Sequence, residues 1–217
     1  MKDVEGLAEN ARELTEQGLS RGEIADELNV SRETAAWLVE RGDATTDAGA
    51  DAVSSETTDG ADDVHVDWST VGEDGERLSA VGAALANTLA EHATTDSDGD
   101  VAVTVGVEKA GVPLATVVAR ELATDLSTYA PSKHRWEEGD LEDGGTFSRN
   151  FAGVEGRSCY VVDDIITSGT TMTETVHAVA AAGGDPIACG VLADKRGLDA
   201  VEDVPVRSLL QVIRVGD

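Results

Sequence analysis

The sequence predicts an α/β protein in which helices flank a parallel sheet and a small all-α module precedes it. The apolar, β-branched run at 160–162 is followed by a loop and by a helical segment at 172–182 that two glycines close. The valine-rich run at 100–107 is also followed by a loop and by a helix starting near Pro113, a residue tolerated in the first helical turn. Helical periodicity of a different kind over residues 1–41 predicts the separate module.

The module at residues 1–41 is expected to contain three short helices. A capping box, with Ser20 at the N-cap and Glu23 three residues later, predicts the start of the second helix, and Ser31 is suited to cap the third. The short turn between these two helices favours a steep crossing, as in a helix-turn-helix. Apolar residues at helical spacing predict the core of the module: Val4, Leu7, Ala8, Ala11, Leu14, Ile24, Ala25, Leu28, Val30, Ala35 and Leu38.

Residues 18–38 resemble the helix-turn-helix of small transcription regulators. The resemblance implies that the third helix enters the major groove of double-stranded promoter DNA, with Arg32 as the candidate for guanine and Glu33 for a cytosine amino group. The alternative is a helical dimerisation module without a DNA role, which the net negative charge of the module favours. The aromatic Trp37 also fits packing in such a module. The expected DNA contacts are Arg21, Ser31, Arg32, Glu33 and Trp37.

The chain is strongly acidic, with 43 acidic against 16 basic residues and a formal net charge of -27. Such an excess destabilises a compact state in dilute buffer, whereas molar salt screens it, so we expect a halophile's cytoplasm. The acidity argues against DNA binding at low salt, but counterion release contributes little in molar salt. Residues 42–63 hold seven acidic residues and no lysine or arginine, which predicts a flexible acidic linker before a ligand domain at 64–217.

Two adjacent carboxylates, Asp163 and Asp164, follow the strand at 160–162 and precede a small, hydroxylated loop. At the carboxyl end of a strand in an open α/β sheet they would face the ligand crevice, where carboxylates accept bonds from vicinal ribose hydroxyls. The loop opens at a helix N-terminus, whose free backbone N–H groups favour an anion. We therefore expect a phosphate on Thr167, Ser168, Gly169, Thr170 and Thr171.

Residues 159–171 resemble the phosphoribosyl-pyrophosphate (PRPP) motif of the type I phosphoribosyltransferases at nearly every position. The resemblance implies a five-stranded parallel core, ribose hydroxyls on Asp163 and Asp164, and the 5-phosphate on the loop that follows. Residues 106–115 are similar to the pyrophosphate loop of orotate phosphoribosyltransferases, which implies a ligand role for Lys109. A solvated loop lysine is the alternative, and the order of strand, aspartate, loop and helix is by itself common in α/β proteins.

The resemblance to orotate enzymes fails at the places where orotate chemistry occurs. Residues 64–77 contain no counterpart of the Lys-Ser-Gly-Arg segment that grips the base. The segment at 132–143, in the position of the catalytic loop, carries five carboxylates, which oppose the departure of pyrophosphate. The Asp-Arg pair that binds the orotate carboxylate is replaced by Asp194 and Lys195, and lysine lacks the bidentate fork of arginine. We therefore expect Lys195 to contact a different anionic ligand.

The whole arrangement resembles the haloarchaeal glucose-fructose catabolism regulators and, like Gram-positive purine repressors, joins a DNA-binding head to such a domain. The resemblance implies a cytoplasmic regulator, mostly an activator of sugar-degradation genes, that senses a phosphorylated metabolite and pairs as a homodimer on a pseudo-palindromic site. It implies no catalytic residues and no required cofactor, with Mg²⁺ entering only with a phosphoribosyl or sugar-phosphate ligand. The alternative is an active orotate or purine phosphoribosyltransferase that uses PRPP and Mg²⁺.

Two further expectations concern metals and membranes. Cys159 and Cys189 lie in apolar, strand-like stretches, so we expect buried thiols and neither a disulfide nor a metal site. His65, His92 and His177 show no metal-ligand spacing, and His134 is either a residue of the loop at 132–143 with a ligand role or a solvated side chain. No apolar run approaches the length of a membrane span, so no membrane partner is expected.

Overall fold

The computed structural model divides into two compact units, residues 1–67 and 68–217. It describes residues 4–17, 19, 21–28, 30–44, 64–96, 101–132 and 145–213. Residues 45–63, which make up most of the expected linker, lie outside this description. The two units are therefore considered one at a time.

The described part of the N-terminal unit forms the three helices that the apolar spacing predicted. They are α1 (Val4–Glu16), α2 (Arg21–Glu27) and α3 (Arg32–Ala44). Ala11, Ile24 and Ala35 lie at the centre of their shared core. The Ser31 hydroxyl oxygen accepts the backbone N–H of Thr34 at 3.1 Å, which confirms Ser31 as the cap of α3. The predicted cap of α2, Ser20, lies outside the described residues.

Helix α3 continues to Ala44, beyond the boundary expected at residue 41. The reason lies at Gly42, where an added Cβ would lie 2.6 Å from the carbonyl oxygen of Ala8 and 3.1 Å from Cβ of Arg12. Glycine therefore lets α3 pass closely over α1. Gly42, expected as the first residue of the linker, is a packing residue of the helical head.

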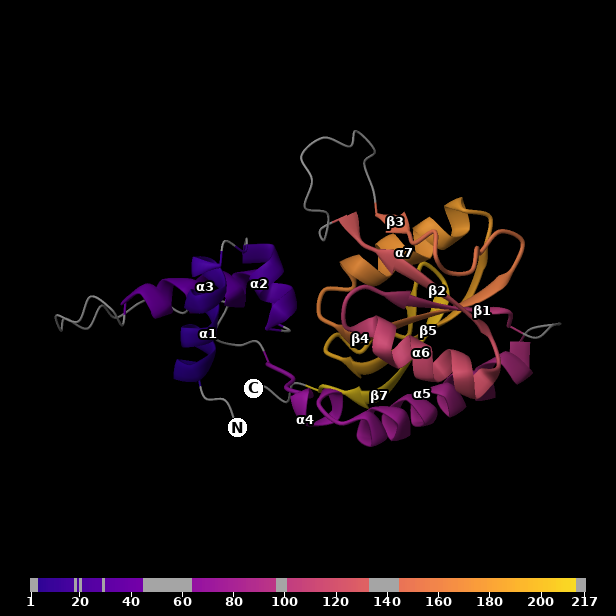
Figure 1. Ribbon diagram of the computed structural model, residues 1–217, viewed down its shortest axis with the longest axis horizontal. Coiled ribbons are helices and arrows are strands. Elements are labelled where there is room, and N and C mark those ends of the chain that lie inside the picture. The colour runs from indigo at the N-terminus through magenta and orange to yellow at the C-terminus, as the bar shows by residue number, and fades with distance from the viewer. Residues whose placement is uncertain are drawn as a thin grey trace. The chain divides into compact units, whose positions relative to one another are not determined.

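The C-terminal unit is built on a seven-stranded sheet in the order β3-β2-β1-β4-β5-β7-β6 (Figure 1). The five adjacent strands from β2 to β7 run parallel, which confirms the expected parallel core. Strands β3 and β6 add antiparallel pairs at the two edges. The bounds are β1 (Val103–Val107), β2 (Asp125–Ala130), β3 (Thr146–Phe147), β4 (Ser158–Ile166), β5 (Asp185–Asp194), β6 (Ala200–Val201) and β7 (Val204–Gln211).

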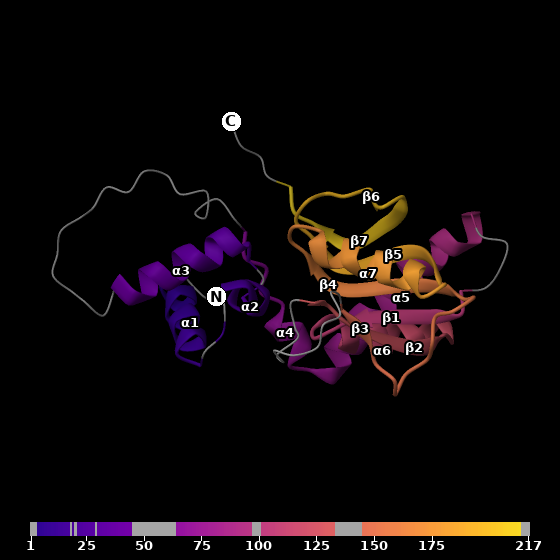
Figure 2. The same ribbon diagram turned by 90° about the horizontal axis from the view of Figure 1, so that it is seen from above.

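Helices cover both faces of this sheet (Figure 2). Helices α5 and α6 pack on one face, and α7 packs on the other against β4 and β5. Helix α5 approaches α6 closely because residue 82 is glycine, where a Cβ would lie 2.6 Å from Cβ of Val117. The bounds are α4 (Ser69–Gly72), α5 (Gly75–Asp96), α6 (Gly111–Leu122) and α7 (Thr170–Ala181).

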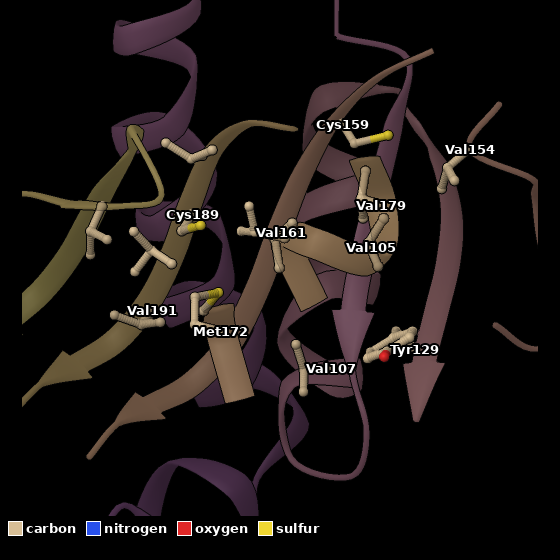
Figure 3. Packing of buried hydrophobic residues seen from close by; sticks show 14 of the residues in the cluster. Val105, Val107, Tyr129, Val154, Cys159, Val161, Met172, Val179, Cys189 and Val191 are labelled. Carbon is tan, nitrogen blue, oxygen red and sulfur yellow. The ribbon is translucent and has the colours of Figure 1, made fainter. Parts of the chain in front are cut away.

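Strand β4 contributes alternate residues to two buried layers. Cys159 and Val161 belong to the same buried cluster as Val179 of α7 (Figure 3). Tyr160 and Val162 belong to the cluster on the face that α5 and α6 cover. A strand buried on both faces is apolar at consecutive positions, which explains the run that predicted a parallel strand.

Strand β4 is longer than the sequence indicated, and it includes the acidic pair. Asp163 pairs with Val191, and Ile166 pairs with Asp194 of the ten-residue strand β5, so pairing with a long neighbour carries β4 past the carboxylates. Helix α6 also starts earlier than expected, at Gly111, with Pro113 inside its first turn. Over the residues that the structure describes, no helix combines the length and apolar character needed to cross a membrane.

Candidate functional site

The acidic pair lies at the carboxyl end of β4, in the middle of the parallel sheet. Asp163 is 9% and Asp164 6% exposed. Oδ1 of Asp163 accepts the backbone N–H of Asp164 at 2.9 Å, which fixes the first carboxylate against the strand. Both side chains are therefore held by the fold, as a site for vicinal hydroxyls requires.

Asp164 also accepts a hydrogen bond from outside the predicted motif. The indole Nε1 of Trp68 donates to its Oδ2 at 2.9 Å. Burial raises the pKa of the Asp164 carboxyl above its ordinary value, and the bond from Trp68 partly opposes this shift by favouring the charged form. Sequence reasoning missed Trp68 because 96 residues separate the two partners. No pattern among the residues next to Trp68 in the sequence indicates that contact.

The predicted phosphate loop follows β4 directly and leads into α7. Gly169 has φ of 87° and precedes the first residue of α7, so the loop turns at the residue where glycine is favoured. The Ser168 hydroxyl donates to Oγ1 of Thr170 at 3.0 Å and orders the loop. A small pocket opens here, lined by Asp163, Ile165, Ile166, Thr167, Ser168, Gly169, Thr171 and Met172. The structure thus brings the first carboxylate and the expected phosphate donors together at one helix N-terminus.

The loop between β1 and α6 lies beside the acidic pair. A Cβ at Gly111 would lie 2.6 Å from the Val162 carbonyl oxygen and 2.8 Å from Cα of Asp163. Lys109, the expected ligand residue of this loop, is exposed. Its neighbour Glu108 is partly buried and accepts a hydrogen bond from Oγ1 of Thr128 at 3.0 Å. Sequence reasoning overlooked Glu108, although an acidic residue in this loop is visible in the sequence.

Asp194 and Lys195 lie at the carboxyl end of β5, next to the phosphate loop. The Asp194 carboxylate accepts the backbone N–H groups of Arg196, Gly197 and Leu198 at 2.8, 3.0 and 2.6 Å, so it organises the turn that follows. The backbone N–H of Lys195 donates to the carbonyl oxygen of Ile166 at 3.0 Å. This bond places Lys195 beside the start of the loop, where a cation would pair with an anionic ligand.

The end of β2 is anchored to α7 by Glu174. Its Oε1 accepts the Tyr129 hydroxyl at 3.0 Å and the backbone N–H of Ser132 at 2.7 Å, and its Oε2 accepts the Ser132 hydroxyl at 3.0 Å. Burial, with the nearby Glu174 carboxylate, raises the pKa of Tyr129 to about 12. The acidic segment expected to replace the catalytic loop follows at once, but residues 133–144 lie outside the described part of the chain.

The two cysteines are buried thiols, as expected. Burial raises the pKa of Cys159 to about 11 and that of Cys189 to about 12, so neither is a reactive thiolate at neutral pH. Among the residues that the structure describes, no group of histidine, cysteine and acidic side chains is arranged to hold a metal ion.

The predicted DNA contacts lie on α3 and at the start of α2. Arg32 is exposed in the first turn of α3, next to the capping residue Ser31. Arg21 is exposed and lies 3.8 Å from the Glu40 carboxylate. Trp37 packs against the helical core, and the guanidinium of Arg41 lies 5.3 Å from its ring. The side chain of Glu33 lies outside the described residues.

Together, the sheet and the loop after β4 define the C-terminal unit as a phosphoribosyltransferase-type domain. The phosphoribosyl transferase domain family matches residues 67–215. An orotate phosphoribosyltransferase from Aeropyrum pernix superposes with a TM-score of 0.54 and 22% identity, covering 68% of this chain and 78% of that one. An adenine phosphoribosyltransferase from Rhodothermus marinus superposes with a TM-score of 0.52 and 21% identity, covering 69% and 88%. At these identities the likeness shows the fold alone.

Relatives that match along the whole chain carry a more specific name. A "Transcriptional regulator GfcR" from Halobacterium salinarum is 61% identical over 217 residues, covering 100% of this chain and 98% of the relative. Proteins of the same name from Haloferax volcanii and Methanocella arvoryzae are 56% and 42% identical, covering 100% and 99% of this chain and 100% of each relative. The chain belongs to the GfcR family of transcriptional regulators. This membership confirms the expectation of a regulator over that of a phosphoribosyltransferase.

Proposed function

We propose that this chain binds promoter DNA through its helical head and responds to a phosphorylated metabolite through its phosphoribosyltransferase-type unit. The observation that carries the proposal is the match to a named transcriptional regulator over the full 217 residues, because it includes the head as well as the ligand domain. We further propose that the regulated genes serve sugar catabolism and that the protein mostly activates them. The setting is the cytoplasm of a halophile.

In this proposal α3 enters the major groove. Arg32 and Ser31 at the N-terminus of α3 support this, because recognition helices contact base edges with their first residues. Arg32 reads guanine and Arg21 contacts a phosphate. Trp37, which packs against the core of the head, holds α3 in place for these contacts. A homodimer would present two such helices to the half-sites of a pseudo-palindrome.

The ligand binds along the carboxyl edge of the sheet. The buried pair Asp163 and Asp164 accepts hydrogen bonds from two vicinal hydroxyls, and the loop at 167–171 donates to a phosphate. Lys195 pairs with a second anionic group at the carboxyl end of β5. No resident cofactor is needed for such binding, and Mg²⁺ enters only with the ligand's phosphates.

Footprinting of the promoters of sugar-catabolism genes in molar KCl, with and without ribose 5-phosphate, tests this proposal. Arg32→Ala should weaken operator binding by about tenfold or more, because a bidentate contact to guanine contributes roughly 1–3 kcal/mol of discrimination. Arg77→Ala is the matched control, since it removes an exposed arginine from α5, in the other unit. It should leave operator affinity unchanged.

Two results would contradict the proposal. Equal operator affinity of Arg32→Ala and the unmodified chain would exclude the docking of α3. Rapid PRPP-dependent conversion of orotate or a purine, together with no promoter binding, would establish an enzyme instead.

A further inference from the structure

We infer that ligand binding releases Trp68 from Asp164 and thereby frees the start of the C-terminal unit. The indole N–H of Trp68 and a ligand hydroxyl compete for the same carboxylate. The inference rests on the proposed ligand role of the acidic pair. It makes Trp68 the residue through which ligand binding reaches the segment that leads to the helical head.

The two acidic side chains of β4 have different surroundings. Asp163 lines the pocket at the phosphate loop, whereas Asp164 is not among the described residues that line it. Two residues before Asp164, Val162 belongs to the buried layer that α5 and α6 cover, and Trp68 packs against that same layer. Alternate residues of a strand share a face, so Asp164 meets Trp68 on this side of the sheet. The second carboxylate is thus engaged with the indole and not with the pocket.

Asp164 offers little room for a further partner while Trp68 stays in place. It is 6% exposed, and its Oδ2 accepts the indole N–H at 2.9 Å. A carboxylate buried to this degree needs a donor, because an unpaired buried charge is costly. A ligand hydroxyl meets the same need as the indole N–H. It reaches this carboxylate only when the indole moves aside.

Trp68 belongs to a part of the unit that burial holds weakly. It precedes α4, a single turn in which no residue is buried, and its carbonyl oxygen accepts the backbone N–H groups of Val71 and Gly72 at 2.8 and 3.1 Å. The turn folds back over the indole, since a Cβ at Gly72 would lie 3.1 Å from Cζ3 of Trp68. The partly buried indole, and not the turn itself, therefore anchors this part of the chain.

Release of Trp68 acts where the chain enters the C-terminal unit. Trp68 is the first residue of that unit, and the residues before it lead to the helical head. Once the indole leaves Asp164, the turn at 69–72 no longer fixes the end of this connecting segment. Added freedom at that point changes the entropy cost of holding the head on an operator, so ligand binding alters promoter affinity.

Nuclear magnetic resonance of the full chain with ¹⁵N-labelled tryptophan tests the release, in molar KCl with Mg²⁺ and with ribose 5-phosphate as the probe. The chain has three tryptophans, and the indole signal that is absent from Trp68→Phe belongs to Trp68. Ribose 5-phosphate should move this signal upfield, because the proton loses its carboxylate acceptor. Its exchange with water should become at least about tenfold faster, as for a group that leaves a protected site.

Calorimetric titration measures what the release costs. Trp68→Phe should bind ribose 5-phosphate about tenfold more tightly, because the ligand no longer displaces a hydrogen bond to a charged group. Gly72→Ala keeps both partners but presses a Cβ against the indole, so it should tighten binding by a smaller factor. Thr70→Ala changes an exposed residue of the same turn and should leave the affinity unchanged. Each affinity is taken at the pH of tightest binding, so that the ionisation of Asp164 does not differ between variants.

Footprinting measures the link to the head. Without ligand, Trp68→Phe should show the promoter affinity that the unmodified chain shows with ribose 5-phosphate. A Trp68 signal that moves on ligand binding while promoter affinity stays the same would overturn this link.

The remaining outcomes separate this inference from the proposed function. Binding of ribose 5-phosphate with an unchanged Trp68 signal would overturn the inference and leave metabolite sensing intact, as would binding by Trp68→Phe no tighter than that by Thr70→Ala. No binding of ribose 5-phosphate by any variant would overturn both the inference and the sugar-phosphate ligand. Release of Trp68 without any promoter binding would support the exchange at Asp164 and contradict the regulator.

Discussion

At the scale of single residues, Asp164 combines a burial cost with a proposed role in ligand binding. Asp164 lies near the carboxyl end of the central strand β4 and is 6% exposed. The indole Nε1 of Trp68 donates a hydrogen bond to its carboxylate. Burial raises its pKa and thereby favours the neutral acid, whereas hydroxyl binding needs an acceptor. The bond from Trp68 favours the charged form, which the proposed ligand would require.

The first prediction concerns the pH dependence of stability. Because the pKa of Asp164 is raised in the folded state, the folded chain binds more protons than the unfolded chain, and stability falls as pH rises from the ordinary value of 3.8 through the folded pKa. Asp164→Asn cannot ionise, so it should be more stable than the unmodified chain at neutral pH and lose this advantage at acid pH. Urea unfolding at several pH values in molar KCl measures the difference.

Two further measurements complete this prediction. Asp199→Asn changes an exposed aspartate in the same unit and should show no such pH-dependent gain. Asp164→Asn should also bind ribose 5-phosphate more weakly without unfolding. A lower stability of Asp164→Asn at neutral pH would show that the fold compensates the charge fully.

The second prediction concerns Trp68. Trp68→Phe keeps an aromatic ring but removes the donor to Asp164, so the free energy of unfolding should fall by about 1.5–3 kcal/mol, as for a hydrogen bond to a charged group. The cost should be smaller in the Asp164→Asn background, because the partner there is neutral. Urea unfolding of the two single variants and the double variant measures this coupling. Equal costs in both backgrounds would mean that Trp68 acts through packing alone.

At the scale of elements, α7 connects the two sides of the proposed ligand site. The loop expected to bind phosphate leads into the N-terminus of α7. Glu174, in the second turn of α7, accepts hydrogen bonds from Tyr129 and Ser132 at the end of β2. The loop enters the helix through Gly169, whose φ of 87° is unfavourable for a residue with a side chain. The geometry of the loop therefore depends on this glycine.

The third prediction tests that dependence. Gly169→Ala should lower the free energy of unfolding by about 1–2 kcal/mol, because alanine is strained at this φ and its Cβ would lie 3.3 Å from Cδ1 of Leu198. It should also weaken ribose 5-phosphate binding, which calorimetry would detect. Gly153→Ala is the control, since no atom lies within 4 Å of a Cβ there. Equal effects of the two substitutions would argue against a special role for the loop.

At the scale of the whole molecule, the net negative charge is the feature that most affects the stability of the folded chain. The 217 residues carry a formal net charge of -27, so their like charges repel one another in dilute buffer. In molar salt the Debye length is about 3 Å, and this screening removes most of the repulsion. Ion pairs on the described surface do not offset it, since pairs such as Arg120 with Glu121 are exposed and contribute little.

The fourth prediction follows from this charge. Lowering KCl from molar concentration to about 0.1 M should lower the melting temperature by roughly 10 °C or more, which corresponds to several kcal/mol in a chain of this size. Thermal melting followed by circular dichroism measures it. NaCl at equal ionic strength should restore the same stability, whereas sucrose at low salt should restore less. A melting temperature independent of salt would show that self-repulsion is not the limiting factor.

Local pattern was enough to predict much of the fold and the site. The apolar run before Asp163, the hydroxylated loop and the two closing glycines predicted strand, loop and helix because those signals act between neighbours in the chain. Helical spacing predicted the head in the same way, with Ser31 at the cap of α3. The boundaries of β4 and α3 shifted because pairing with β5 and close packing at Gly42 act from elsewhere in the chain.

The sequence by itself therefore determined the two kinds of unit, the acidic pair followed by a hydroxylated loop at a helix start, and the membership of a regulator family. Only the tertiary structure decided the surroundings of that pair: Trp68 on Asp164, and Glu108 held by Thr128 at the neighbouring strand end. The physical reason is the order of strands in the sheet. It brings together side chains that lie far apart in the chain, and no periodicity or spacing encodes that order locally.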